Sequence, residues 1–135
     1  MTLAETIEAF EFLTDRQERI EELVRASRRF QQAESPKPFP EANRVPGCES
    51  EAFVWVTGDQ AAVKLGFAVE NPQGVSAMAL ATILRETMDG LPASDFSSIP
   101  DDLHLRLFGA ELSMGKALGL GNLVAAVKVG AAGLG

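Results

Sequence analysis

Two runs of strand-forming residues with a turn signal between them constrain the fold of this chain most strongly. Residues 52–56 and 61–69 are rich in apolar, aromatic and β-branched side chains, and residues 57–60 between them contain Gly58-Asp59. A Gly-Asp pair in this position is typical of a β-hairpin. Large apolar side chains alternate along the second run at Val63, Leu65, Phe67 and Val69. We therefore expect an antiparallel hairpin that is covered on one face.

Helical patterns precede the hairpin. Thr2 with Glu5, and Thr14 with Gln17, have the spacing of a capping box, so two N-terminal helices are expected. The proline-rich residues 35–40 end the second helical pattern and favour an extended connector.

Helical patterns also follow the hairpin. Asn71-Pro72 predicts the start of a helix that is apolar almost all round and therefore buried. A short helix is expected over residues 100–108, and a last helix from about Ser113 to Val129. The last helix contains several glycines, which destabilise a helix unless neighbouring elements approach closely. Helices that precede and follow a small antiparallel sheet along the sequence predict an α+β fold, with one domain over residues 1–135.

The segment just before the hairpin combines strand and turn signals. Arg44-Val45-Pro46 is a candidate for a short third strand, which its proline would confine to the sheet edge. Pro46-Gly47 then forms a turn signal just before Cys48, the single cysteine. A lone thiol thus lies where a loop meets a strand, and such loops often carry function.

Composition narrows the partners and the compartment. The net charge is −7, which argues against nucleic acid as the main partner because phosphate binding needs a cationic surface. No run of about 18 apolar residues is present, and the first residues lack a secretory pattern, so we expect no membrane span and a cytoplasmic protein. One cysteine forms no internal disulfide, which also suits a reducing compartment.

Cys48 itself has two interpretations. Free cysteines are often inert and buried, so packing alone could account for it. Its neighbours Glu49 and Glu51 disfavour a thiolate, and the nearest cation in sequence is Arg44. The local sequence fits a thiol that accepts sulfur or takes part in exchange, with activation supplied from elsewhere in the fold.

Other candidate chemistry is weaker. His104, the single histidine, is expected to be solvated or to cap a helix rather than to pair with the cysteine. The segment Gly115-Lys-Ala-Leu-Gly-Leu-Gly121 fits neither glycine-rich phosphate-binding pattern. No cluster of His, Cys and carboxylate residues has metal-ligand spacing, so no metal or cofactor is expected.

The segment Asn43-Arg-Val-Pro-Gly-Cys-Glu-Ser-Glu-Ala-Phe-Val resembles the active-site segment of the SufE family of sulfur acceptors. The family pattern is roughly Asn-x-Val-x-Gly-Cys-x-Ser-x-Val-Trp-Val. The resemblance implies a SufE-like α+β fold, similar to that of the iron–sulfur scaffold family. It also implies a partner, a cysteine desulfurase that carries pyridoxal phosphate and forms a persulfide on its own cysteine.

By the same resemblance, Cys48 is the persulfide carrier that takes this sulfur and passes it to an iron–sulfur scaffold. Asn43, Gly47 and Ser50 are motif residues expected to shape the loop, and Lys116 stands where the family usually has arginine. The protein would then be an accessory sulfurtransferase and desulfurase activator rather than a stand-alone enzyme. With one cysteine, it lacks the roughly three cysteine ligands a cluster scaffold needs.

Two alternatives remain at this point. The chain could be a helical interaction module in which Cys48 is inert and buried. It could also be a one-cysteine peroxidase-like reductant, although the sequence near Cys48 lacks the cationic activator that such enzymes use.

Overall fold

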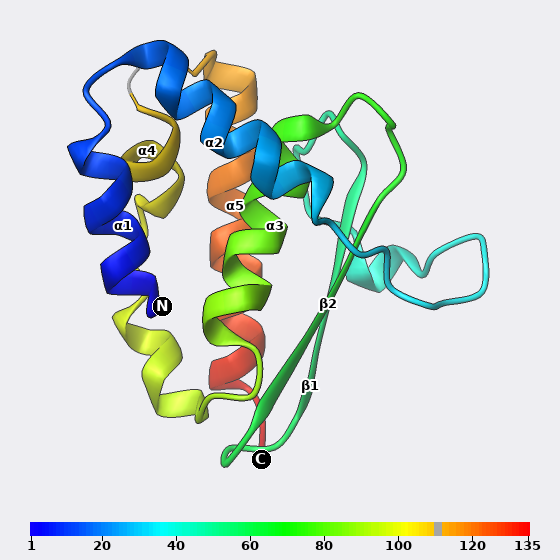
Figure 1. The fold of residues 1–135 in the computed structure, drawn as a ribbon. Coiled ribbons are helices and arrows are strands. Elements are labelled where there is room, and N and C mark those ends of the chain that lie inside the picture. Colours follow the sequence, from blue (N-terminus) through cyan, green and yellow to red (C-terminus); the bar gives the residue numbers. More distant parts are fainter. Residues whose placement is uncertain (110–111) are drawn as a thin grey trace.

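The computed structural model describes residues 1–109 and 112–135 (Figure 1). The elements in chain order are α1 (Leu3–Phe12), α2 (Arg16–Arg28), the 3-10 helix η1 (Glu41–Asn43), β1 (Ala52–Gly58), β2 (Val63–Val69), α3 (Val75–Met88), the 3-10 helix η2 (Ala93–Ser98), α4 (Leu103–Phe108) and α5 (Met114–Ala132). A two-stranded antiparallel sheet with helices before and after it confirms the α+β prediction.

The hairpin is in the predicted place, with a shifted turn. The strands pair from Ala52 opposite Val69 to Gly58 opposite Val63. The turn covers residues 59–62 instead of 57–60, because the Asp59 carboxylate accepts hydrogen bonds from the backbone N–H groups of Ala61 and Ala62. The four predicted apolar side chains of β2 are buried, which confirms the predicted alternation.

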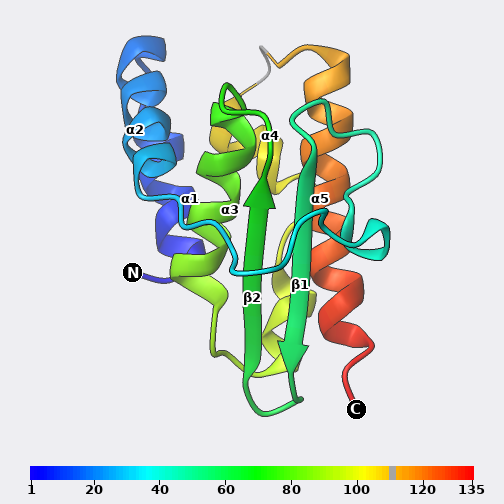
Figure 2. The ribbon, with the colours of Figure 1, turned by 90° about the vertical axis from the view of Figure 1, so that its right-hand side faces the viewer.

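The outer face of the sheet is not bare, contrary to the expectation of one covered face. The connector between α2 and η1 crosses it (Figure 2). Phe39 from this connector packs on Phe53 and Trp55, with ring centroids 5.1 and 5.8 Å apart. The expected third strand at the sheet edge is reduced to a single bridge between Arg44 and Phe53.

Two helix starts differ from the prediction, and in both cases a nearby side chain accepts a hydrogen bond from a backbone N–H group. The cap of α2 is Asp15, whose carboxylate accepts from the N–H of Gln17, and not Thr14. In the same way the side chain of Asn71 accepts from the N–H of Gln73 and holds a turn, so α3 begins only at Val75. The capping box of α1, between Thr2 and Glu5, is formed as predicted.

The elements lie in layers. Helices α3 and α5 pack on the inner face of the sheet, and α1 and α4 lie beyond them, while α2 packs against α3 (Figures 1 and 2). Close packing of α5 depends on glycine: a Cβ atom on Gly130 would lie 2.7 Å from a methyl carbon of Val56 on β1. The glycines of α5 therefore mark close approaches, as the sequence suggested.

Candidate functional site

Cys48 lies on a short loop that enters β1. A hydrogen bond of 2.8 Å from the N–H of Val45 to the carbonyl of Ala52 closes this loop. Within it Gly47 has φ +68°, a left-handed conformation that glycine adopts without steric cost, and the N–H of Glu51 bonds to the carbonyl of Cys48. The turn chemistry predicted around Pro46-Gly47 thus places the thiol on a tight, hydrogen-bonded loop.

The loop is docked on α5. The side-chain amide of Asn122 donates a 2.7 Å hydrogen bond to the carbonyl of Pro46. A Cβ atom on Gly119 would lie 2.9 Å from the Cα atom of Cys48 and 3.0 Å from the carbonyl oxygen of Gly47. Glycine is therefore the residue that lets the loop backbone reach the helix, and Cys48 is left partly buried.

The other side of the loop meets the segment before α3. The carbonyl of Ser50 accepts from the N–H of Asn71, and a Cβ atom on Gly74 would lie 2.8 Å from the Cβ atom of Ser50. Between α3, α5 and the loop lies a pocket of about 80 Å³. It is lined by Cys48, Glu49, Ser50, Gln73, Gly74, Val75, Ser76, Ala77, Gly115, Lys116, Gly119 and Leu120.

The surroundings of this pocket favour an anion. The first turns of α3 and α5 both contribute to its lining, and helix N-termini carry partial positive charge. Lys116, in the first turn of α5, adds a full positive charge. The exposed carboxylate of Glu49 opposes this and lies over Gly115. Arg44, the nearest cation in sequence, is paired with Glu41 and lies over the Phe53 ring.

The predicted site residues fall into three groups. Cys48, Ser50 and Lys116 line one pocket, although Lys116 is far from the other two in sequence. Gly47 lies beside this pocket and contacts α5. Asn43 is not in the lining: its side-chain amide donates a 2.9 Å hydrogen bond to the carbonyl of Val54 and ties η1 to β1.

Three further residues of the site did not emerge from the sequence. Gly74, Gly119 and Asn122 hold or admit the loop from other elements. The sequence contained a signal for Gly119 alone, because a glycine inside a helix indicates a close neighbour, but it did not show which segment that neighbour was.

His104 is placed differently from the prediction. It is buried at 8% exposure and packs against Gly121, and its Nδ1 atom has no hydrogen-bond partner in the described part of the chain. It is neither solvated nor a helix cap, and it does not line the Cys48 pocket. Burial lowers the pKa of the His104 imidazole, partly offset by the nearby carboxylate of Asp102.

This burial predicts a pH-dependent stability. Unfolded His104 takes up a proton below about pH 6.5, whereas the folded state resists protonation, so the free energy of unfolding should fall as the pH drops below that value. The slope from one proton is at most about 1.4 kcal/mol per pH unit. Urea unfolding at pH 7.5 and 5.5 measures it, and His104→Gln should lose part of the difference. An unchanged pH dependence in His104→Gln would contradict the assignment.

The described residues contain no group of three or more His, Cys, Asp or Glu side chains that could hold a metal ion. Among the same residues, no helix has the length and apolar character needed to cross a membrane. The pocket at Cys48 is also well below the roughly 300–1,000 Å³ of typical small-molecule sites. A pocket of this size has room for a small anion.

The fold and site define a small α+β domain with one cysteine on a docked loop. Residues 4–131 match the SufE family, described as an Fe-S metabolism associated domain, and the chain belongs to this family. The family associates the protein with iron–sulfur metabolism. No curated protein matches the chain.

The fold is also similar to a solved structure. A solution structure of a hypothetical protein from Thermus thermophilus aligns with a TM-score of 0.72 and 22% sequence identity. The alignment covers 98% of this chain and 96% of that one. At this identity the likeness supports the fold and says nothing about activity.

Proposed function

We propose that this protein accepts sulfur on Cys48 from a cysteine desulfurase and passes it to an iron–sulfur scaffold. The observation that carries the proposal is the position of the single cysteine of a SufE-family chain. It lies on a surface loop, partly exposed, beside a pocket that favours an anion. The desulfurase is the partner that would hold pyridoxal phosphate; this chain needs no cofactor of its own for the step.

The transfer is a thiol exchange. The Cys48 thiolate attacks the outer sulfur of the desulfurase persulfide, a new S–S bond forms on Cys48, and the S–S bond of the donor breaks. The donor cysteine leaves as a thiolate and takes up a proton, so the transfer involves no net oxidation or reduction. A second exchange of the same kind, with a scaffold thiol as the attacking group, would release the sulfur.

The residues around Cys48 have separate roles in this proposal. Lys116 and the first turns of α3 and α5 line the pocket beside Cys48, where their positive charge would suit a persulfide anion after transfer. Ser50 borders the same pocket, and Gly47 and Asn43 fix the shape and the base of the loop. The positive charge beside Cys48 thus comes from residues distant in sequence, whereas its sequence neighbours Glu49 and Glu51 are acidic.

The size of the pocket supports delivery of sulfur by another protein. A space of about 80 Å³ does not hold a free amino-acid substrate together with its reaction partners. The role is therefore that of an accessory sulfurtransferase and activator. We place it in the cytoplasm, where reducing conditions keep a lone thiol free for exchange.

Stimulation of the desulfurase tests this function. Removal of sulfur from the donor persulfide regenerates its cysteine, so the protein should raise the rate of alanine formation from cysteine by severalfold or more at equal desulfurase concentration. The rate is followed with and without this protein. An interaction module with an inert cysteine would give the same rate in both cases, or a rate that survives alkylation of Cys48, and either result would count against sulfur acceptance.

A further inference from the structure

A second hollow lies away from Cys48, between the first three long helices. α1 packs against α3 and α4, and α2 packs against α3. From the loop that connects them, α1 and α2 run in different directions (Figure 1). The groove between them has a volume of about 710 Å³. It is lined by Met1, Thr6, Ala9, Phe10, Leu13, Glu18, Glu21, Glu22, Arg25, Ala26, Arg29, Ile83, Glu86 and Thr87, none of which lines the Cys48 pocket.

The groove is elongated and follows helix faces. Its α2 wall is formed by residues at positions 18, 21, 22, 25, 26 and 29, one face of the helix over three turns. At 1.5 Å per residue this wall is about 16 Å long. The α1 wall repeats the same spacing at positions 6, 9, 10 and 13. The α1 and α2 faces border the same open groove, which leaves space that a third helix would fill.

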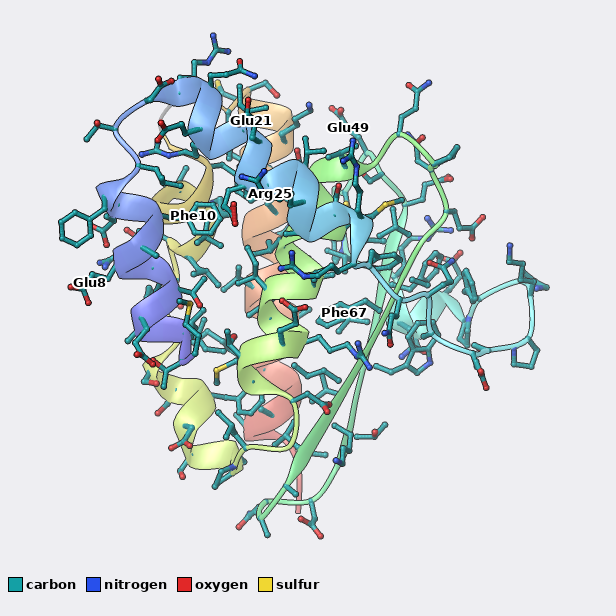
Figure 3. All side chains as sticks on the ribbon, viewed as in Figure 1. Glu8, Phe10, Glu21, Arg25, Glu49 and Phe67 are labelled. Carbon is teal, nitrogen blue, oxygen red and sulfur yellow. The ribbon has the colours of Figure 1, made fainter. Side chains whose placement is uncertain are left out.

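The floor of the groove is apolar. Phe10 of α1, Ala26 of α2 and Ile83 of α3 are buried at its base. Figure 3 shows Phe10 on the side of α1 that faces α2 and α3, whereas Glu8 points away from them. The floor thus matches the apolar stripe of an amphipathic helix.

The rim is acidic. Its two arginines are each neutralised: Arg25 pairs with Glu22 at 3.0 Å and Arg29 with Glu86 at 2.9 Å. Glu18 and Glu21 also line the groove, and no arginine or lysine of the described residues pairs with them. The rim therefore carries net negative charge above an apolar floor.

We propose that this groove binds an amphipathic helix of about three turns from a partner protein, with an apolar stripe flanked by lysine or arginine. The length of the groove favours a helix over a compact small molecule, and the charge of its rim selects a basic one. A second copy of this chain is disfavoured, because each copy has a net charge of −7. The site is separate from Cys48, so a partner held here leaves the thiol free.

Synthetic peptides test the proposal on the full chain, without a desulfurase. The probe has about fifteen residues, with leucine at helical spacing and lysine on the flanks. One control peptide replaces each lysine with glutamate, and another keeps the composition but breaks the helical spacing. Amide chemical shifts, recorded by NMR during titration, locate the site. We expect saturable binding of the lysine peptide with shifts around Ala9, Phe10 and Ala26, at least about tenfold tighter than either control.

Matched variants assign the binding to the groove. Ala9 is exposed and lines the groove, so Ala9→Trp fills it without disturbing the core and should abolish binding. Glu18→Gln with Glu21→Gln should weaken it about threefold to tenfold, whereas Glu8→Gln, outside the groove, should not. Circular dichroism checks that each variant is folded. Cys48→Ser should bind as well as the wild type, which separates this proposal from sulfur transfer.

Several outcomes would overturn the proposal. These are equal binding of the glutamate peptide, an affinity weaker than about 1 mM, shifts confined to another surface, or binding that survives Ala9→Trp. Sedimentation equilibrium tests for another such outcome. If the protein formed a dimer that Ala9→Trp dissociates, the occupant of the groove would be a second copy of this chain. Tight binding of decylamine with none of the peptide would make it a small-molecule site.

Discussion

Replacing Cys48 with serine is expected to abolish sulfur acceptance and leave the fold intact. Serine keeps the size and the position of the side chain but has no thiolate to attack a persulfide. Because Cys48 is only partly buried, the change in the free energy of unfolding should stay within about 1 kcal/mol. The alanine-forming rate of the desulfurase should fall to its value without this protein, and urea unfolding measures the stability.

A relocated thiol is the matched control for this variant. Ala125 is exposed on α5 and does not line the Cys48 pocket. Combining Cys48→Ser with Ala125→Cys therefore keeps one thiol per chain but places it away from the loop and the pocket. We expect no stimulation from this double variant. If the relocated thiol restored the rate, the loop and its pocket would have no part in the reaction.

Gly119→Val should both destabilise the protein and release the Cys48 loop. A Cβ atom at this position would meet backbone atoms of Cys48 and Gly47, at 2.9 and 3.0 Å, so the loop must move away from α5. Overpacking of this kind costs about 1–3 kcal/mol. The freed thiol should react severalfold faster with a chromogenic disulfide reagent, measured under conditions in which the variant remains folded.

Ala125→Val measures what valine costs in the same helix without the contact. Ala125 is exposed, so this change should cost only the helix-propensity difference, about 0.7 kcal/mol or less. The rate of the thiol reaction should stay at the wild-type value. The docking of the loop on Gly119 would be refuted by a Gly119→Val variant that matches Ala125→Val in both stability and thiol reactivity.

The features that the sequence predicted well are those set by neighbouring residues. The alternation in β2 identified its buried face, and the capping box between Thr2 and Glu5 identified the start of α1. Pro46-Gly47 likewise indicated the turn that presents Cys48. Where two adjacent residues could serve the same role, the choice was wrong: Asp15 and not Thr14 caps α2, since its carboxylate reaches the N–H of Gln17.

Features set by contacts between distant segments were not predictable in detail. The glycines of α5 indicated close neighbours, but only the fold shows that Gly119 faces the cysteine loop and Gly121 faces His104. The burial of His104 has the same origin, because it depends on the packing of α4 against α5. Lys116 was expected near Cys48 only from the family resemblance, and the structure lines one pocket with both.

The groove between α1 and α2 shows the same limit. The sequence of α2 mixes acidic and basic residues, a pattern typical of a solvated helix face. It did not show that α1 and α2 diverge and leave an apolar floor beneath those charges. The position of one helix relative to another decides whether such a face is a plain surface or one wall of a binding site.

The intact mass of the protein after incubation with an active cysteine desulfurase and cysteine tests the central claim most directly. We expect a gain of roughly 32 Da, one sulfur atom, that maps to Cys48 and disappears on treatment with a reductant. An unchanged mass, while the desulfurase in the same tube continues to form alanine, would contradict it.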